Sequence, residues 1–99
     1  MKEIFLVVIL LVLIYRCIKK KIEETAEVYN SRGATKGYLK DFTGAILDFS
    51  KAIKLNPKYA VAYYNRGNAK CDLKDCKDGI ADYNKAIELN PELKNPNEN

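Results

Sequence analysis

The hydrophobic positions of the chain form one unbroken run near the amino terminus, followed by two stretches with a helical period. Residues 4–15 read IFLVVILLVLIY, an uninterrupted apolar segment of twelve residues. Between Phe42 and Ile53 the apolar residues recur every three or four positions, which predicts a helix with one buried face. A similar spacing returns between positions 76 and 87. Because an Asn-Pro pair follows each stretch and proline cannot continue a helix, we expect both helices to end there.

The apolar run, extended past Arg16 to Ile18, predicts a single helix through a membrane. Its 15 residues would span about 22 Å as a helix, whereas a bilayer core is about 30 Å thick. Lys2 and Arg16 would lengthen its reach by snorkelling. A cleaved export signal and a buried core helix are the alternatives. Against cleavage, the basic residues at 16 and 19–21 stand where a signal-peptide site needs small ones.

The net charge of +4 lies entirely in the first 21 residues, where five basic side chains accompany one acidic side chain. The remaining 78 residues carry twelve of each sign. The positive-inside rule then predicts a single-pass membrane protein whose folded part, which follows the lysines, is cytoplasmic; export through an amino-terminal signal is the alternative. A folded part without excess positive charge also argues against a nucleic-acid partner.

Residues 26–59 repeat as residues 60–93, at an offset of 34 positions, with sixteen identities. Each unit predicts two helices. Tyr29, Gly33 and Lys36 have the spacing of one helical face in the first helix of the first unit. Asp41 is positioned as the N-cap of the second helix, which carries the periodic apolar stripe.

A helix–turn–helix period of 34 residues with this pattern resembles the tetratricopeptide repeat (TPR). The positions typical of that family are occupied in the first unit by Tyr29, Gly33, Ala45, Phe49, Ala52 and Pro57. In the second unit they are occupied by Tyr63, Gly67, Gly79, Tyr83, Ala86 and Pro91. The resemblance implies an all-α fold: two helix–turn–helix units, a fragment of an α-solenoid, preceded here by the hydrophobic, transmembrane helix.

Two departures from the family pattern carry expectations of their own. Arg32 and Arg66 stand where the family has leucine, so each needs an acidic partner beside its stem. We expect Asp48 to pair with Arg66 or, failing that, with Arg32. Gly79 stands where the family has alanine, which predicts a looser second repeat, because glycine costs about 1 kcal/mol in a helix interior.

The predicted domain organisation has five parts. They are a membrane anchor with its basic flank (1–21), a helical linker (22–25), the first repeat (26–59), the second repeat (60–93) and a disordered tail (94–99). No proline or glycine precedes Gly33, so we expect the anchor helix to run without a break into the first repeat.

The resemblance implies a groove that is lined by the first helix of each repeat and holds a peptide or a partner helix. Helical spacing assigns these residues to it: Asn30, Ala34, Tyr38, Tyr64, Asn65, Asn68 and Asp72. Asparagine amides can bond a peptide backbone, and tyrosines offer contact area that is both apolar and polar. A solvated polar face without a ligand is the alternative.

The chemistry-bearing residues argue against catalysis. The chain has no histidine, so it lacks a Ser-His-Asp triad, a Cys-His pair and an imidazole metal site. Its cysteines, Cys17, Cys71 and Cys76, form no C-x-x-C motif and are expected to be free thiols, with a Cys71–Cys76 redox pair as the alternative. We therefore expect no enzyme, no catalytic residue, no cofactor and no metal.

The sequence thus predicts a membrane-tethered TPR module that binds a protein or peptide partner and is attached through residues 4–18. A self-assembling structural repeat protein is one alternative, and a non-functional remnant of a longer TPR array is another. Because about three repeats are usually needed for stability, residues 22–99 are not expected to form a firm monomer. The apolar edge with Ile80, Tyr83 and Ile87 would then seek another chain, in a homo-oligomer or with a partner's helix.

Overall fold

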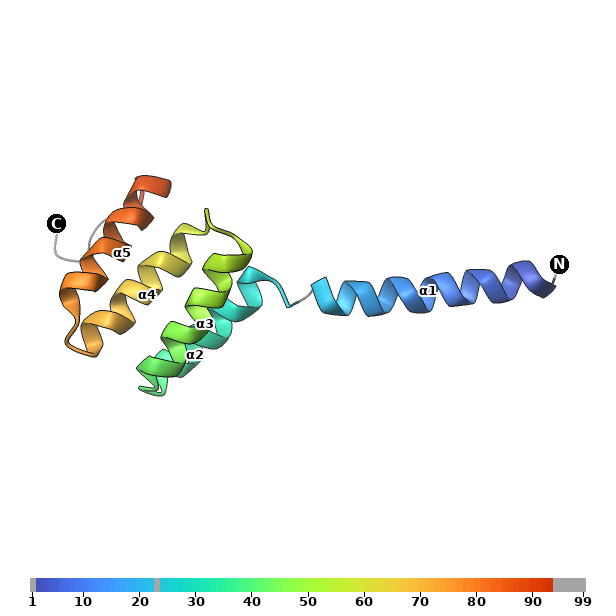
Figure 1. The fold of residues 1–99 in the computed structure, drawn as a ribbon, viewed down its shortest axis with the longest axis horizontal. Helices are drawn as coiled ribbons and strands as arrows, with labels where there is room; N and C mark the ends of the chain where they lie inside the picture. Colours follow the sequence, from blue (N-terminus) through green and yellow to red (C-terminus); the bar gives the residue numbers. More distant parts are fainter. Residues whose placement is uncertain (1, 23, 94–99) are drawn as a thin grey trace.

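The computed structural model describes residues 2–22 and 24–93 and folds them into helices (Figure 1). Their bounds are α1 Lys2–Ile22, α2 Ala26–Tyr38, α3 Phe42–Leu55, α4 Ala60–Asp72 and α5 Cys76–Leu89. The predicted all-α class and the two helix–turn–helix units are confirmed. The tail predicted to be disordered, 94–99, lies outside the described residues.

The two repeats stack side by side in chain order (Figure 1). α2 packs against α3, α4 packs against α5, and α3 joins the two repeats by packing against α4. Both repeats turn between their helices in the same way, with Lys40 and Lys74 in the left-handed region at φ 68° and φ 71°. Asp41 caps α3 as predicted, because its Oδ1 accepts a hydrogen bond from the Gly44 backbone N–H at 3.0 Å.

Small residues form most of the core. One cluster contains Ala26, Ala52 and Ala62, and joins α2, α3 and α4. A second cluster contains Ala45 and Phe49 of α3 with Ala69 of α4. Because alanine adds little bulk, the helix backbones approach closely, and the repeat-to-repeat junction is mainly alanine packed on alanine and phenylalanine.

The second repeat is closed by two glycines that face each other across α4 and α5. A Cβ atom built on Gly67 would lie 2.7 Å from the carbonyl oxygen of Gly79, and a Cβ on Gly79 would lie 2.7 Å from the carbonyl oxygen of Gly67. The missing side chain of Gly79 lets the backbones of α4 and α5 meet, which is a packing role that the sequence did not reveal. That Gly79 also loosens this repeat stays a prediction.

The predicted helical linker at 22–25 is also wrong. α1 ends at Ile22, the chain bends at Glu24, and Thr25 is extended with φ −85° and ψ 172°. The Thr25 carbonyl accepts the first bond of α2, from the Tyr29 N–H at 3.2 Å, so Thr25 is its N-cap. Lys19 and Lys20 near the end of α1 and Glu27 in the first turn of α2 suit the end of one helix dipole and the start of another. Position 23 lies outside the described residues.

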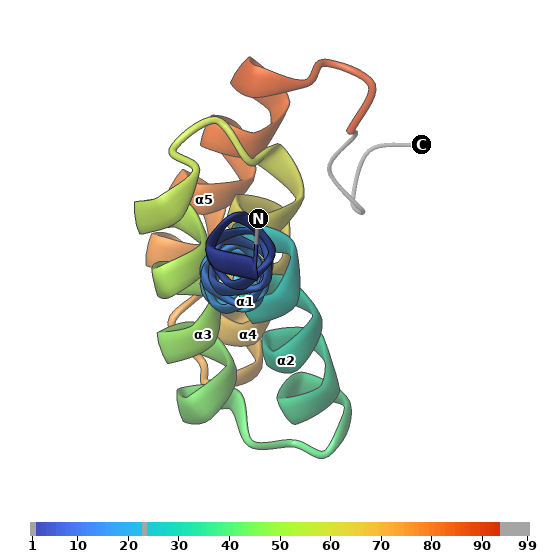
Figure 2. The ribbon, with the colours of Figure 1, turned by 90° about the vertical axis from the view of Figure 1, so that its right-hand side faces the viewer.

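α1 projects away from the repeats and packs against none of the other four helices (Figures 1 and 2). Its large apolar side chains, from Ile4 to Tyr15 together with Ile18, are between 42% and 68% exposed. Among the described helices, none combines the length and the apolar character that a membrane crossing requires. The predicted span at 4–18 is therefore not supported. Its unbroken apolar part is twelve residues, and charged side chains occupy both ends of α1.

Candidate functional site

A cavity of about 210 Å³ opens between α2, α3 and α4. Phe42, Phe49 and Ala69 form its apolar part, and the remaining lining residues are Ala34, Gly37, Asn65, Asn68 and Asp72. Four of the seven residues assigned to the groove from helical spacing are in this lining: Ala34, Asn65, Asn68 and Asp72. We call this cavity and its lining the central groove.

The amides of the central groove are held by hydrogen bonds to neighbouring helices. Asn65 Nδ2 on α4 donates to Asn30 Oδ1 on α2 at 3.1 Å, so Asn30 positions a groove residue without lining the cavity. The Tyr83 hydroxyl of α5 donates to Asn68 Oδ1. Asn65 Oδ1 and Asn68 Nδ2 have no partner within residues 24–93, which leaves one acceptor and one donor. A peptide backbone presents the complementary pair.

The two predicted tyrosines do not line the central groove. Tyr38, at the end of α2, is 87% exposed and lies outside the cavity. The Tyr64 ring packs against the Tyr83 ring of α5, with centroids 5.3 Å apart and planes tilted by 56°. Helical spacing alone could not show how far along the stack the cavity extends.

Sequence reasoning missed the floor of the groove. Phe42 and Phe49 belong to the apolar stripe of α3, which was assigned to the core, and Gly37 and Ala69 carry no chemical signal. Their small or flat side chains open the space between α2 and α4. The available signal was the pairing of two aromatic residues on α3 with glycine and alanine on the facing helices.

The thiol and phenol next to the groove are held in their protonated forms. A hydrogen bond with Cys76 and burial raise the pKa of the Cys71 thiol. Burial, followed by the neighbouring Cys71, raises the pKa of the Tyr83 hydroxyl well above its ordinary value, so it remains a donor to Asn68. All three cysteines are free. In the part of the chain with described side chains, no group of three potential metal ligands occurs.

A buried ion cluster joins the two helices of the second repeat. Arg66 donates two hydrogen bonds of 2.8 Å to Asp82, from Nε to Oδ2 and from Nη2 to Oδ1. Lys70 Nζ lies 2.9 Å from Asp82 Oδ2. Burial by itself would raise the pKa of Asp82, but the hydrogen bonds from Arg66 and Lys70 outweigh it and hold this pKa below its ordinary value.

The predicted pairing of Asp48 is wrong. Its Oδ2 lies 2.8 Å from Lys36 Nζ, an ion pair that lacks the angles of a hydrogen bond. Arg66 pairs with Asp82 instead, and Arg32 lies over the Tyr29 ring at 5.5 Å. The acid on the second helix of each repeat faces the first helix of the same repeat, so the 34-residue offset does not bring Asp48 to Arg66.

Two sequence families match the chain. One, described as TPR repeat, matches residues 38–74, and the other, described as Tetratricopeptide repeat, matches residues 60–93. The chain therefore belongs to the tetratricopeptide repeat family, as its motifs predicted. Among curated proteins, none matches it. TPR repeats are typically non-catalytic protein–protein interaction modules, and the family therefore suggests that role for this chain.

Proposed function

We propose that the protein is a non-catalytic interaction module that holds a peptide segment or a partner helix in the central groove. The observation that carries this proposal is the combination of an apolar floor with an amide acceptor and an amide donor that face no partner in the described chain. An apolar floor binds a side chain, and paired amides bind the backbone beside it.

The size and charge of the central groove narrow the ligand class. Small-molecule sites usually enclose about 300–1,000 Å³, whereas this cavity has about 210 Å³, which suits one or two side chains of a longer ligand. Asp72 is the charged residue of the lining and is exposed. The proposed ligand therefore presents an apolar side chain to Phe42 and Phe49 and a basic residue near Asp72.

Blocking the central groove is expected to abolish peptide capture. A displayed library of random twelve-residue peptides is panned against the full chain, and the enriched peptides are then measured against Ala34→Trp. Ala34 is exposed and lines the cavity, so an indole there fills the groove without entering the core. We expect binding to weaken at least tenfold, about 1.4 kcal/mol or more.

The matched control is Thr43→Trp, because Thr43 is exposed on α3 and does not line the groove. This variant should bind the enriched peptides as the unmodified chain does. Equal binding by Ala34→Trp, or a library that yields no enriched peptide, would count against the groove as the binding site.

We further propose that α1 attaches the module to a membrane surface by entering the lipid without crossing it. Its apolar side chains are exposed around the whole helix, and none of them packs on the repeats. Burying such a segment in acyl chains removes its apolar area from water. Arg16, Lys19 and Lys20 follow at the end of the run, where anionic headgroups would attract them.

A charge in the middle of α1 is expected to abolish this attachment. The full chain is floated with vesicles of four parts phosphatidylcholine and one part phosphatidylserine, alone and as Leu10→Asp. A charged residue in the acyl region costs about 2.5–3.5 kcal/mol, so the floated fraction should fall more than tenfold. Leu47→Asp is the control, because Leu47 is equally exposed but lies on α3. Flotation that is the same for Leu10→Asp, or absent for the unmodified chain, would refute the attachment.

A further inference from the structure

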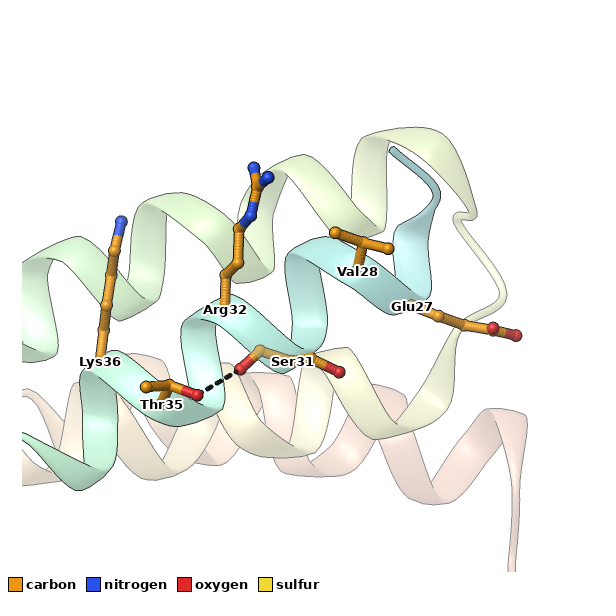
Figure 3. Close-up of a pocket in the computed structure, with 6 residues that line it drawn as sticks. All are labelled: Glu27, Val28, Ser31, Arg32, Thr35 and Lys36. Atoms are coloured by element: carbon orange, nitrogen blue, oxygen red, sulfur yellow. Dashed lines mark hydrogen bonds between the residues drawn. The ribbon is translucent and has the colours of Figure 1, made fainter. Parts of the chain in front are cut away.

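A groove of about 490 Å³ runs along α2 and is lined by α2 residues alone, of which Lys36 also pairs with Asp48 of α3 (Figure 3). Val28, Arg32 and Lys36 form one row along it, and Ser31 and Thr35 form a second row (Figure 3). We call these five residues the α2 face. They do not line the central groove, so the inference below does not depend on the proposed peptide ligand.

The chain itself shows what packs on such a face. The residues 34 positions further on lie on α4, and three of them, Ala62, Arg66 and Ala69, meet α3 inside the stack. Ala62 joins the buried cluster with Ala52, and Ala69 joins the cluster with Ala45. The equivalent of Arg32 is Arg66, whose Nη1 donates to Ser50 Oγ of α3 at 3.2 Å.

The outer side of α5 repeats the surface that α3 offers to α4. Ile80 is the equivalent of Ile46, and Asn84 is the equivalent of Ser50. Ile46 and Ser50 are half-buried inside the stack, whereas Ile80 is 48% exposed and Asn84 is exposed. We call Ile80 and Asn84, on this side of α5, the α5 face.

The α2 face is uncovered in the same way. Val28 is half-buried and Thr35 exposed, whereas their equivalents Ala62 and Ala69 are 0% and 3% exposed. Within the described residues Arg32 pairs with no acidic side chain, and its guanidinium lies over the Tyr29 ring. Each end of the stack therefore exposes one half of an interface that the chain already forms between its own repeats.

We propose that a second copy of this chain seats its α5 face on the α2 face, so that copies stack head to tail in the register of the repeats. At this junction the guanidinium of Arg32 donates to the amide oxygen of Asn84, as Arg66 donates to the hydroxyl of Ser50. Val28 takes the place of Ala62, and Ile80 packs on α2 as Ile46 packs on α4. The contact uses different surfaces on the two copies, so it stays open at both ends of a growing stack.

The α1 helix is a poorer occupant of the α2 face. Arg16 lies 34 positions before Ser50, as Arg32 lies 34 positions before Arg66. If α1 folded back onto α2 in the same way that α3 packs on α4, Arg16 would therefore take the place of Ser50 and face Arg32. Like charges at that contact repel, and one groove would cover only one side of a helix that is apolar all round. α1 projects from the same end of the stack, so a seated copy requires α1 to turn at Glu24 and Thr25. No packing is lost in that turn, because α1 contacts no other helix.

Charge substitutions on the two faces test the contact in the full chain. The protein is held in an excess of non-ionic detergent micelles, which cover α1, and its mass is followed by sedimentation from one to a hundred micromolar. We expect the mass of the unmodified chain to rise past the dimer. Arg32→Glu and Asn84→Lys should each stay monomeric over this range. Lys58→Glu, the same charge change as Arg32→Glu on the loop between α3 and α4, should associate normally.

An equimolar mixture of Arg32→Glu and Asn84→Lys should regain association. The carboxylate at position 32 of one variant then meets the ammonium at position 84 of the other, and the second junction is the native one. Three results would overturn the proposal. They are a monomeric unmodified chain, association that neither substitution changes, and loss with Asn84→Lys alone, which would indicate two α5 faces paired with each other.

Discussion

Replacing Gly67 with alanine is expected to destabilise the protein by about 2–3 kcal/mol, although alanine is the better helix former. The added Cβ would lie 2.7 Å from the carbonyl oxygen of Gly79 and 3.0 Å from the Tyr83 ring. A backbone carbonyl cannot rotate aside as a side chain can, so α4 and α5 must separate and uncover Tyr83. In a thermal melt followed by circular dichroism, the midpoint should fall by roughly 10–20 °C.

Gly37→Ala is the matched control for this prediction. A Cβ on Gly37 meets only Ala45 Cβ, at the ordinary distance of 3.9 Å. The same chemical change, also within a first helix of a repeat, should therefore leave the melting midpoint unchanged or raise it. If Gly67→Ala and Gly37→Ala had the same melting midpoint, the contact between Gly67 and Gly79 would not set the distance between α4 and α5.

Replacing Arg66 with alanine is expected to cost about 2–3 kcal/mol, because it leaves a buried carboxylate with a single cation. The Asp82 side chain is only 8% exposed, and Arg66 supplies two of its hydrogen bonds. Lys70 remains as a partner, which keeps the loss below the 3–5 kcal/mol typical of an orphaned buried charge. Urea unfolding at neutral pH measures the difference as a lower midpoint.

Arg32→Ala tests the same residue at the equivalent position of the first repeat. Arg32 is exposed, lies over the Tyr29 ring and forms no ion pair within the described residues, so its removal should cost less than about 1 kcal/mol. Asp82→Asn combined with Arg66→Ala should lose less than the sum of the single variants, because the buried carboxylate is itself removed and Lys70 keeps Asp78 at 3.2 Å. Equal losses for Arg66→Ala and Arg32→Ala would mean that the buried ion cluster contributes nothing specific.

The repeat architecture was predictable because its signal is redundant. Sixteen identities at one offset set the boundaries of both units, and a single misread position would not have changed them. Features set by one or two residues were less predictable. Thr25 is extended at the start of α2 although its side chain makes no capping hydrogen bond and good helix formers occur on both sides, so propensity alone did not reveal the break.

The side-chain partners were harder to predict for a geometric reason. Helical spacing tells which residues share a face, but not which neighbouring helix that face meets. Asp48 was therefore assigned to the wrong repeat, and Tyr64 was assigned to a groove when its ring packs on Tyr83. The role of Gly79 was also hidden from the sequence. It depends on the close approach of the Gly67 carbonyl oxygen, which no sequence pattern reveals.

The different ion pairs of the two repeats give the stack a direction. Asp82 pairs with both Arg66 and Lys70, whereas Asp48 pairs with Lys36 alone. The ion pairing between α4 and α5 is therefore stronger than the ion pairing between α2 and α3. In a one-dimensional array of repeats, local opening begins at the unit with the weaker internal energy. Fraying is thus expected to start at α2 and travel toward α5, so the first repeat, which follows α1, should open before the second.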